Sequence, residues 1–196
     1  LARRMHQLPP ADVLVIDEAH HSASDSYKAL LACYPEAFVI GATATPWRTD
    51  KIGLGDLFDD YVLAASPAEL MRDGWLCPFD AYAYDSPALH EVRITAGDFN
   101  QKDLGIACNT DVLVGSVVHE YATHAAGRRA VVFAVNVEHS ESLRAQFEAA
   151  GFSAVHVDYK TPRQDRKDRL ERFGSGDATI LCSVNVVSEG FDIPEA

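Results

Sequence analysis

Long apolar runs are absent from this chain of 196 residues. None approaches the roughly 18 consecutive apolar residues that a membrane-spanning helix requires, and the chain does not open on a basic segment followed by an apolar one. We therefore expect no membrane partner. Cysteine is also sparse. The four cysteines lie far apart and form no C-x-x-C pair, which disfavours zinc ribbons and disulfide scaffolds and favours reduced thiols in a cytoplasmic protein.

Basic residues are outnumbered, since 17 Lys and Arg against 29 Asp and Glu give a formal net charge of −12. This balance excludes a polybasic arm or a generally cationic coat, so any contact with nucleic acid must come from a local patch. The chain also lacks an initiator methionine at position 1, and residues 193–196 close no helix or strand. We therefore expect a segment of a longer protein.

What is present is ordinary globular composition, 47% apolar and 23% charged, in alternating short apolar runs and amphipathic segments. Strands are expected at residues 13–16, 37–40, 61–65, 79–84, 130–135, 154–157 and 179–183, and helices at 24–34, 67–72, 111–125, 138–149 and 163–173. The first two strands are continuously apolar, which predicts burial on both faces of a parallel sheet. Alternating strands and helices predict the α/β class, built from right-handed βαβ units.

The pattern weakens between residue 85 and about residue 110, where proline, glycine and mixed polar residues replace it. Two blocks separated by such a break predict two α/β lobes, each incomplete in this chain. We expect the first lobe to span residues 1–80, a connection to span 81–109, and the second lobe to span 110–196.

An acidic motif, Asp17-Glu18-Ala19-His20, directly follows the first apolar strand. Carboxylates at the carboxyl end of a parallel strand lie where α/β folds bind ligands. There an Asp can hold Mg²⁺ and a neighbouring Glu can accept a proton from an attacking water. The alternative is a solvated acidic loop. A second motif, the small and hydroxyl-bearing run 41–48, follows the next strand and would by itself indicate only a turn.

Together, in this order and at this spacing, the two motifs resemble the superfamily 2 helicases and translocases of the DEAH type. Residues 17–20 are similar to motif II, the Walker B element, and Thr43-Ala44-Thr45 is similar to motif III. The second block continues the resemblance. Three further segments are similar to family motifs. They are residues 131–134 with 136–140 (motif IV), the stretch from His156 to Gly176, and residues 185–194 (motif V).

This resemblance implies two RecA-like lobes, with ATP in the cleft between them and a strand of DNA or RNA crossing both. It implies that Asp17 coordinates Mg²⁺ with Glu18, that Glu18 and Asp17 form the catalytic pair, and that His20, Thr43 and Thr45 couple hydrolysis to lobe closure. The remaining expected site residues contact the nucleotide (Gly190 and Asp192) or the nucleic acid (Arg48, Asn136 and Ser188).

Two family motifs are missing from these residues: the phosphate-cradling loop G-x-x-x-x-G-K-[ST] and the arginine-bearing motif VI. We therefore expect the 196 residues alone to be inactive as an ATPase, although the longer protein is expected to be a helicase that acts on DNA in preference to RNA. Two alternatives stay open. One is a restriction- or remodelling-type translocase that moves on double-stranded DNA, and the other is a helicase-like binding module without catalysis.

Several other features have plainer interpretations. His119 and His124 are five positions apart, which turns them away from one another on a helix and disfavours a zinc pair. Residues 160–172 hold six basic side chains against three acidic ones, typical of a solvated helix face but compatible with a nucleic-acid or interdomain role. Trp47 and Trp75 are expected to pack in a core or an interface rather than to stack on bases.

Overall fold

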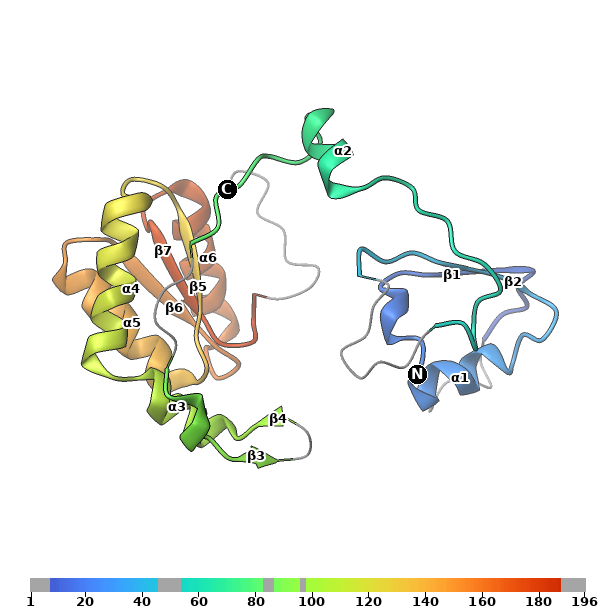
Figure 1. The fold of residues 1–196 in the computed structure, drawn as a ribbon, viewed down its shortest axis with the longest axis horizontal. Coiled ribbons are helices and arrows are strands. Elements are labelled where there is room, and N and C mark those ends of the chain that lie inside the picture. The colour runs from blue at the N-terminus through green and yellow to red at the C-terminus, as the bar shows by residue number, and fades with distance from the viewer. Residues whose placement is uncertain (1–7, 46–53, 83–86, 96–97, 188–196) are drawn as a thin grey trace. The chain divides into compact units, whose positions relative to one another are not determined.

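The computed structural model describes residues 8–45, 54–82, 87–95 and 98–187. The chain divides into two compact units, unit 1 (Leu1–Ala81) and unit 2 (Tyr82–Ala196). Both units are α/β, with parallel strands accompanied by helices (Figure 1). The predicted α/β class with parallel sheets is confirmed.

Unit 1 is built on two parallel strands, β1 (Val13–Ile16) and β2 (Phe38–Gly41), in the register Val13↔Phe38 to Ile16↔Gly41. The short 3-10 helix η2 (Ala19–His21) and helix α1 (Asp25–Leu31) lie between the two strands in sequence, as the crossover between parallel strands requires. Helix α2 (Pro67–Arg72) follows later and begins with a capping box between Ser66 and Glu69.

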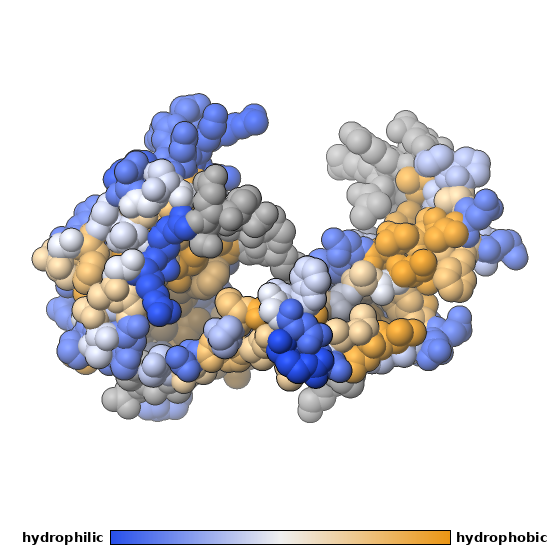
Figure 2. Space-filling view, turned by 90° about the horizontal axis from the view of Figure 1, so that it is seen from above, coloured by the Kyte–Doolittle hydropathy of each residue, from blue (hydrophilic) through white to orange (hydrophobic). Residues whose placement is uncertain are grey.

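The side chains of β1 and β2 contradict the expected burial on both faces. Val13, Val15, Phe38 and Ile40 are exposed, whereas Ile16 is buried. These four residues alternate along paired strands and therefore share one face, which no described helix covers. Hydrophobic residues accordingly gather on the surface of unit 1, at the right of Figure 2.

Two further expectations for unit 1 are wrong. Residues 61–65 form no strand, and neither do residues 79–82, while 83 and 84 lie outside the described residues. Their β-branched and aromatic composition favours strands, but a strand also needs a neighbour to pair with, and here Tyr61, Val62 and Leu63 are exposed. Trp75 is exposed too, so core packing is wrong for that residue, and Trp47 lies outside the described residues.

Unit 2 carries a three-stranded parallel sheet in the order β5 (Ala130–Phe133), β7 (Ile180–Ser183), β6 (Ala154–Val157). Helices α4 (Asp111–His124) and α5 (Val137–Ala149) cover one face, and α6 (Arg163–Ser175) covers the other (Figure 1). These elements fall close to their predicted positions. The central strand is therefore the last of the three in sequence.

The core of unit 2 has two layers because successive strand residues point to opposite faces. One layer joins Phe147, Leu143 and Tyr121 to Ala154, Ile180 and Cys182 of the sheet. The other joins Phe173 of α6 to Val155, Val157 and Leu181. Strands β6 and β7 are buried throughout, as continuous apolar runs predict for strands covered on both faces.

The weakly patterned segment between residues 85 and 110 also has structure of its own. It contains the 3-10 helix η3 (Leu89–Glu91), the hairpin strands β3 (Ile94–Thr95) and β4 (Asp98–Phe99), and helix α3 (Gln101–Cys108). Asn100 caps α3 by accepting from the backbone N–H groups of Lys102 and Asp103. Arg93 then binds the Asp103 carboxylate through two hydrogen bonds of 2.6 and 3.0 Å.

Candidate functional site

The acidic motif forms the loop that follows β1, as the sequence predicts. Asp17 is exposed, and its Oδ1 accepts a hydrogen bond of 2.9 Å from the backbone N–H of Glu18. Glu18 itself has left-handed backbone angles, φ 51° and ψ 48°. A non-glycine residue in this region carries conformational strain, and such strain concentrates at functional sites. The turn at Glu18 directs the chain from the strand into η2.

This loop lies against the loop that follows β2. The backbone N–H of Ala42 donates to Ile16 (2.8 Å), and the N–H of Ala19 donates to Ala42 (2.9 Å). Gly41 allows this close approach, since a Cβ at that position would lie 2.8 Å from the Cβ of Ala19 and 2.6 Å from the ring of Phe58. Only glycine fits between them, and the two loops are therefore held at one edge of the sheet.

His20, Thr43 and Thr45 meet at this edge. The Nδ1 atom of His20 lies 3.0 Å from Oγ1 of Thr43 and 3.4 Å from Oγ1 of Thr45, and it also lies 3.4 Å from Oε2 of Glu18. The backbone N–H of Thr45 donates to Oγ1 of Thr43 at 3.1 Å. His20 thus connects the acidic loop to the hydroxyl loop. The structure brings together five of the six residues that the sequence selected in unit 1, and the sixth, Arg48, lies outside the described residues.

The carboxylates of this loop fit a hydrated Mg²⁺ better than a metal cage. Mg²⁺ commonly binds one or two carboxylates and keeps several waters or phosphate oxygens as its other ligands. Asp17 and Glu18 offer two carboxylates on an accessible loop. Within the described part of the chain, no group of three or more His, Cys, Asp or Glu residues could enclose a metal ion. The donor set therefore suits an ion that keeps most of its other ligands.

Asn136, a predicted nucleic-acid contact, lies at the carboxyl end of β5. Its Oδ1 caps helix α5 by accepting a 2.8 Å hydrogen bond from the backbone N–H of His139. Its side-chain amide nitrogen packs against Gly105 of α3, where an added Cβ would collide with it. Sequence reasoning missed this structural role, although Asn before a helix is an ordinary capping signal.

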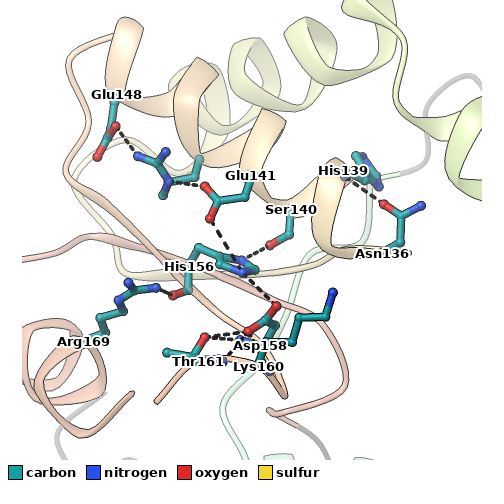
Figure 3. A network of polar contacts seen from close by, with 11 residues as sticks. Asn136, His139, Ser140, Glu141, Glu148, His156, Asp158, Lys160, Thr161 and Arg169 are labelled. Atoms are coloured by element: carbon teal, nitrogen blue, oxygen red, sulfur yellow. Dashed lines mark hydrogen bonds and ion pairs between the residues drawn. The ribbon is translucent and has the colours of Figure 1, made fainter. Parts of the chain in front are cut away.

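Beside Asn136, unit 2 contains a buried polar network that the sequence did not reveal (Figure 3). On β6, the Nδ1 atom of His156 lies 2.6 Å from Oγ of Ser140, and its Nε2 atom lies 3.7 Å from the carboxylate of Asp158. All three residues are buried. Ser140 is inaccessible to a substrate, so the arrangement organises the carboxyl edge of the sheet and does not provide a nucleophile.

Four predicted site residues, Arg48, Ser188, Gly190 and Asp192, lie outside the described residues. The near-zinc pattern on α4 has another explanation. His124 pairs with Glu120, with Nε2 at 3.3 Å from the carboxylate, and its ring stacks on Tyr82 at 4.3 Å between centroids. No helix in the described segments is both long and apolar enough to cross a membrane.

Comparisons with known proteins divide the chain in the same order as the motifs. Residues 5–48 match the family described as "Type III restriction enzyme, res subunit", and residues 106–196 match the "Helicase conserved C-terminal domain". These matches support a superfamily 2 helicase. These two family matches do not distinguish the DEAH type from other types of helicase.

Two similar proteins align with almost the whole chain. The "51.5 kDa protein" of a Lactococcus phage (isolate 7-9) is 34% identical over 192 residues, covering 98% of this chain and 42% of the phage protein. The Saccharomyces cerevisiae protein named "Putative ATP-dependent helicase IRC3" is 29% identical over 207 residues, covering 99% of this chain and 30% of its own length. The chain therefore spans less than half the length of either relative.

A solved structure of S. cerevisiae Dbp5 L327V bound to RNA and ADP BeF3 aligns with 100% of this chain and 46% of its own chain. The TM-score is 0.48 and the sequence identity is 14%.

Proposed function

We propose that this chain is part of an ATP-dependent, DEAH-type motor that moves on or unwinds DNA, in preference to RNA, in the cytoplasm. In this proposal residues 1–80 belong to the ATP-binding lobe, 81–109 connect the lobes and 110–196 belong to the second lobe. The observation that carries the proposal is the contact of His20 with Thr43 and Thr45, which joins the acidic loop to the hydroxyl loop.

In the proposed mechanism Asp17 and Glu18 would hold the Mg²⁺ that accompanies ATP, and Glu18 would also accept the proton of the attacking water. When bound, Mg²⁺ neutralises charge on the phosphates. The exposed position of Asp17 and the accessible carboxylate of Glu18 support these roles. The hydroxyls of Thr43 and Thr45 offer no negative charge to a metal ion, and they are poor bases near neutral pH. Their contacts with His20 therefore serve to couple hydrolysis to movement.

The other expected site residues, four of which lie outside the described segments, complete the proposal by resemblance. Gly190 and Asp192 approach the nucleotide from the second lobe. Arg48, Asn136 and Ser188 contact the nucleic acid. For Asn136 this role rests on the resemblance alone, because Oδ1 caps α5 and the side-chain amide nitrogen packs against Gly105.

Two variants test whether Glu18 serves ATP hydrolysis while Thr43 and Thr45 couple hydrolysis to movement. The test uses a protein that joins this segment to a phosphate-binding loop and motif VI. Glu18→Gln keeps the shape of the side chain but removes the base, so ATP binding persists while turnover falls by about 100-fold or more. Replacing Thr43 and Thr45 by Ala leaves DNA-stimulated ATPase activity largely intact while strand separation or translocation falls sharply.

The matched control for the double variant is Thr123→Ala, which removes an exposed helix hydroxyl that bonds only to the carbonyl of His119. Near-normal turnover in Glu18→Gln would refute the base, and a proportional loss of hydrolysis and movement would refute coupling. The 196 residues alone contain no phosphate-binding loop and are expected to show no DNA-stimulated ATPase activity, so robust activity from them would contradict the proposal as well.

The match of residues 5–48 to a restriction-enzyme subunit favours one second candidate, a translocase that moves on double-stranded DNA without separating its strands. A triplex-displacement assay detects such movement, and a forked duplex detects unwinding. Displacement without unwinding would select the translocase. A helicase-like module that binds nucleic acid without catalysis would show neither activity.

A further inference from the structure

The loop that follows β6 presents an aromatic ring and a positive charge to solvent. Tyr159 is 70% exposed although it lies next to the fully buried end of β6. The Nζ atom of Lys160 lies 5.5 Å from the centroid of the Tyr159 ring. Both side chains are exposed, and the roles assigned above to individual residues include neither of them.

The backbone of this loop is fixed by a buried carboxylate. Oδ1 of Asp158 accepts hydrogen bonds from the backbone N–H of Lys160 (3.0 Å), from the backbone N–H of Thr161 (2.7 Å) and from the Thr161 hydroxyl (2.7 Å). Oγ1 of Thr161 in turn accepts from the backbone N–H of Asp158 (3.0 Å). These reciprocal bonds close the turn, so Tyr159 and Lys160 project from a rigid backbone (Figure 3, which labels Lys160).

The turn is also supported from the elements on either side. Nη2 of Arg166, on α6, donates to the carbonyl of Asp158 (3.0 Å) and to that of Thr161 (3.3 Å). His156 lies beneath, 3.7 Å from the second oxygen of Asp158. Burial by itself would raise the pKa of Asp158, but the bonds from Thr161, the charge of His156 and the bond from Lys160 together hold this pKa below its usual value. The carboxylate therefore stays ionised and keeps accepting.

The surroundings of the loop are basic on an otherwise acidic chain. Helix α6 begins directly after it, and an open hollow of about 500 Å³ on this helix is lined by Arg163, Arg166 and Lys167 with Leu170 and Glu171. The net charge of the chain is −12, so most of its surface repels a polyanion. Lys160 and the first turns of α6 are thus a local site where a phosphate backbone is attracted.

We propose that Tyr159 and Lys160 form a contact for single-stranded nucleic acid, in which a base stacks on the Tyr159 ring and Lys160 pairs with a phosphate. The inference rests on the proposed function, which it deepens by naming residues that hold the strand. An exposed aromatic ring suits this partner because every base has a π-face, so stacking requires no particular sequence. A motor that moves along a strand needs such sequence-tolerant contacts.

The test of stacking compares three variants of the full chain in fluorescence anisotropy with labelled oligo-dT and oligo-U of about 15 nucleotides. Tyr159→Ala is expected to weaken binding by about tenfold, whereas Tyr159→Phe keeps the ring and stays within about twofold of the unsubstituted chain. Tyr61→Ala, at a tyrosine that is 59% exposed in unit 1, is the matched control and leaves the affinity unchanged. On an oligonucleotide of abasic sites, Tyr159→Ala and the unsubstituted chain should bind equally.

The test of the charge uses Lys160→Gln, with Lys102→Gln on α3 as its control. Loss of one phosphate contact should weaken binding and reduce the slope of log affinity against log salt by about 0.7. The control should change neither quantity. Thermal melting of each variant checks folding, and an exposed ring and an exposed ammonium should leave the melting temperature unaltered.

The outcomes separate this inference from the proposed function. If the unsubstituted chain binds neither oligonucleotide, the proposed function fails for this segment, and the contact fails with it. If the chain binds but Tyr159→Ala binds equally well, or loses as much affinity on the abasic strand, the stacking contact alone is wrong. A loss with Tyr159→Ala on base-containing strands, rescued by Tyr159→Phe, supports it.

Discussion

Unit 1 and unit 2 share parallel strands but differ in how their sheets are covered. In unit 2 the side chains of β6 and β7 are buried by α5 on one face and α6 on the other. In unit 1 the face of β1 and β2 that carries Val13, Val15, Phe38 and Ile40, its outward face, remains exposed. The comparison shows that an apolar sequence makes the burial of a strand favourable. Whether the strand is buried depends on the helices that pack on it.

Thiol reactivity should show the largest difference between the units. Cys182 lies on the central strand of unit 2, and burial raises the pKa of its thiol to about 12, whereas Cys77 in unit 1 is exposed. At about pH 8 only about one Cys182 thiol in ten thousand is ionised, and the thiolate is the reactive form. Labelling with a thiol-reactive dye, read residue by residue by mass spectrometry, should modify Cys77 quickly and Cys182 only when unit 2 unfolds. Equal rates would show that the core of unit 2 is open.

A matched pair of phenylalanines tests the difference in packing. Phe147 on α5 is 1% exposed and contacts the rings of Tyr121 and Phe152, whereas Phe38 on β2 is 69% exposed. Phe147→Ala should lower the free energy of unfolding by about 3–5 kcal/mol, and Phe38→Ala should change it by less than about 0.5 kcal/mol. Urea unfolding followed by circular dichroism measures both. A comparable loss for Phe38→Ala would mean that the outward face of unit 1 is covered.

Two helical glycines give the third test. Gly105 packs against the side chain of Asn136, while nothing lies within 4 Å of a Cβ built at Gly115. Gly105→Ala should displace Asn136 and destabilise unit 2 by about 1–3 kcal/mol, because the cap of α5 is disturbed. Gly115→Ala should instead stabilise helix α4 by about 0.5–1 kcal/mol. The same unfolding measurement distinguishes the signs. Stabilisation by Gly105→Ala would contradict the packing described for α3, and destabilisation by Gly115→Ala would contradict the open space at that position on α4.

The smallest expected effect is a change in how the free energy of unfolding depends on pH. Burial lowers the pKa of His139, whose Nδ1 accepts from the backbone N–H of Val135. As the pH falls below about 6.5, the unfolded chain binds a proton that the folded chain refuses, so the free energy of unfolding decreases until the folded pKa is reached. Between about pH 7.5 and about pH 5.5, the unsubstituted chain should therefore lose more stability than His139→Gln. The exposed His90→Gln serves as control, and its loss should match the unsubstituted chain.

The sequence predicted the elements whose signal is local. The apolar runs at 154–157 and 179–183 contain β6 and β7, and the acidic motif forms the loop that follows β1, as its place in the sequence predicts. Features that depend on distant partners were not predictable. The run 61–65 formed no strand because it found no neighbour, and the left-handed turn at Glu18 has no signal in its residue type. The roles of the site residues themselves remain predictions.

The strand order of unit 2 also has a consequence for biosynthesis. Strands β5 and β6 leave the ribosome before β7, yet within the described residues each of them pairs with β7 alone, which lies between them. Until residues 180–183 emerge, both earlier strands have unpaired edges, and the buried faces of α5 and α6 have only part of the sheet to pack on. Closing the sheet is then a contact between distant segments, which is slow and leaves the nascent chain exposed to aggregation. A ribosome stalled before β7 would therefore carry a unit 2 whose sheet has not yet formed.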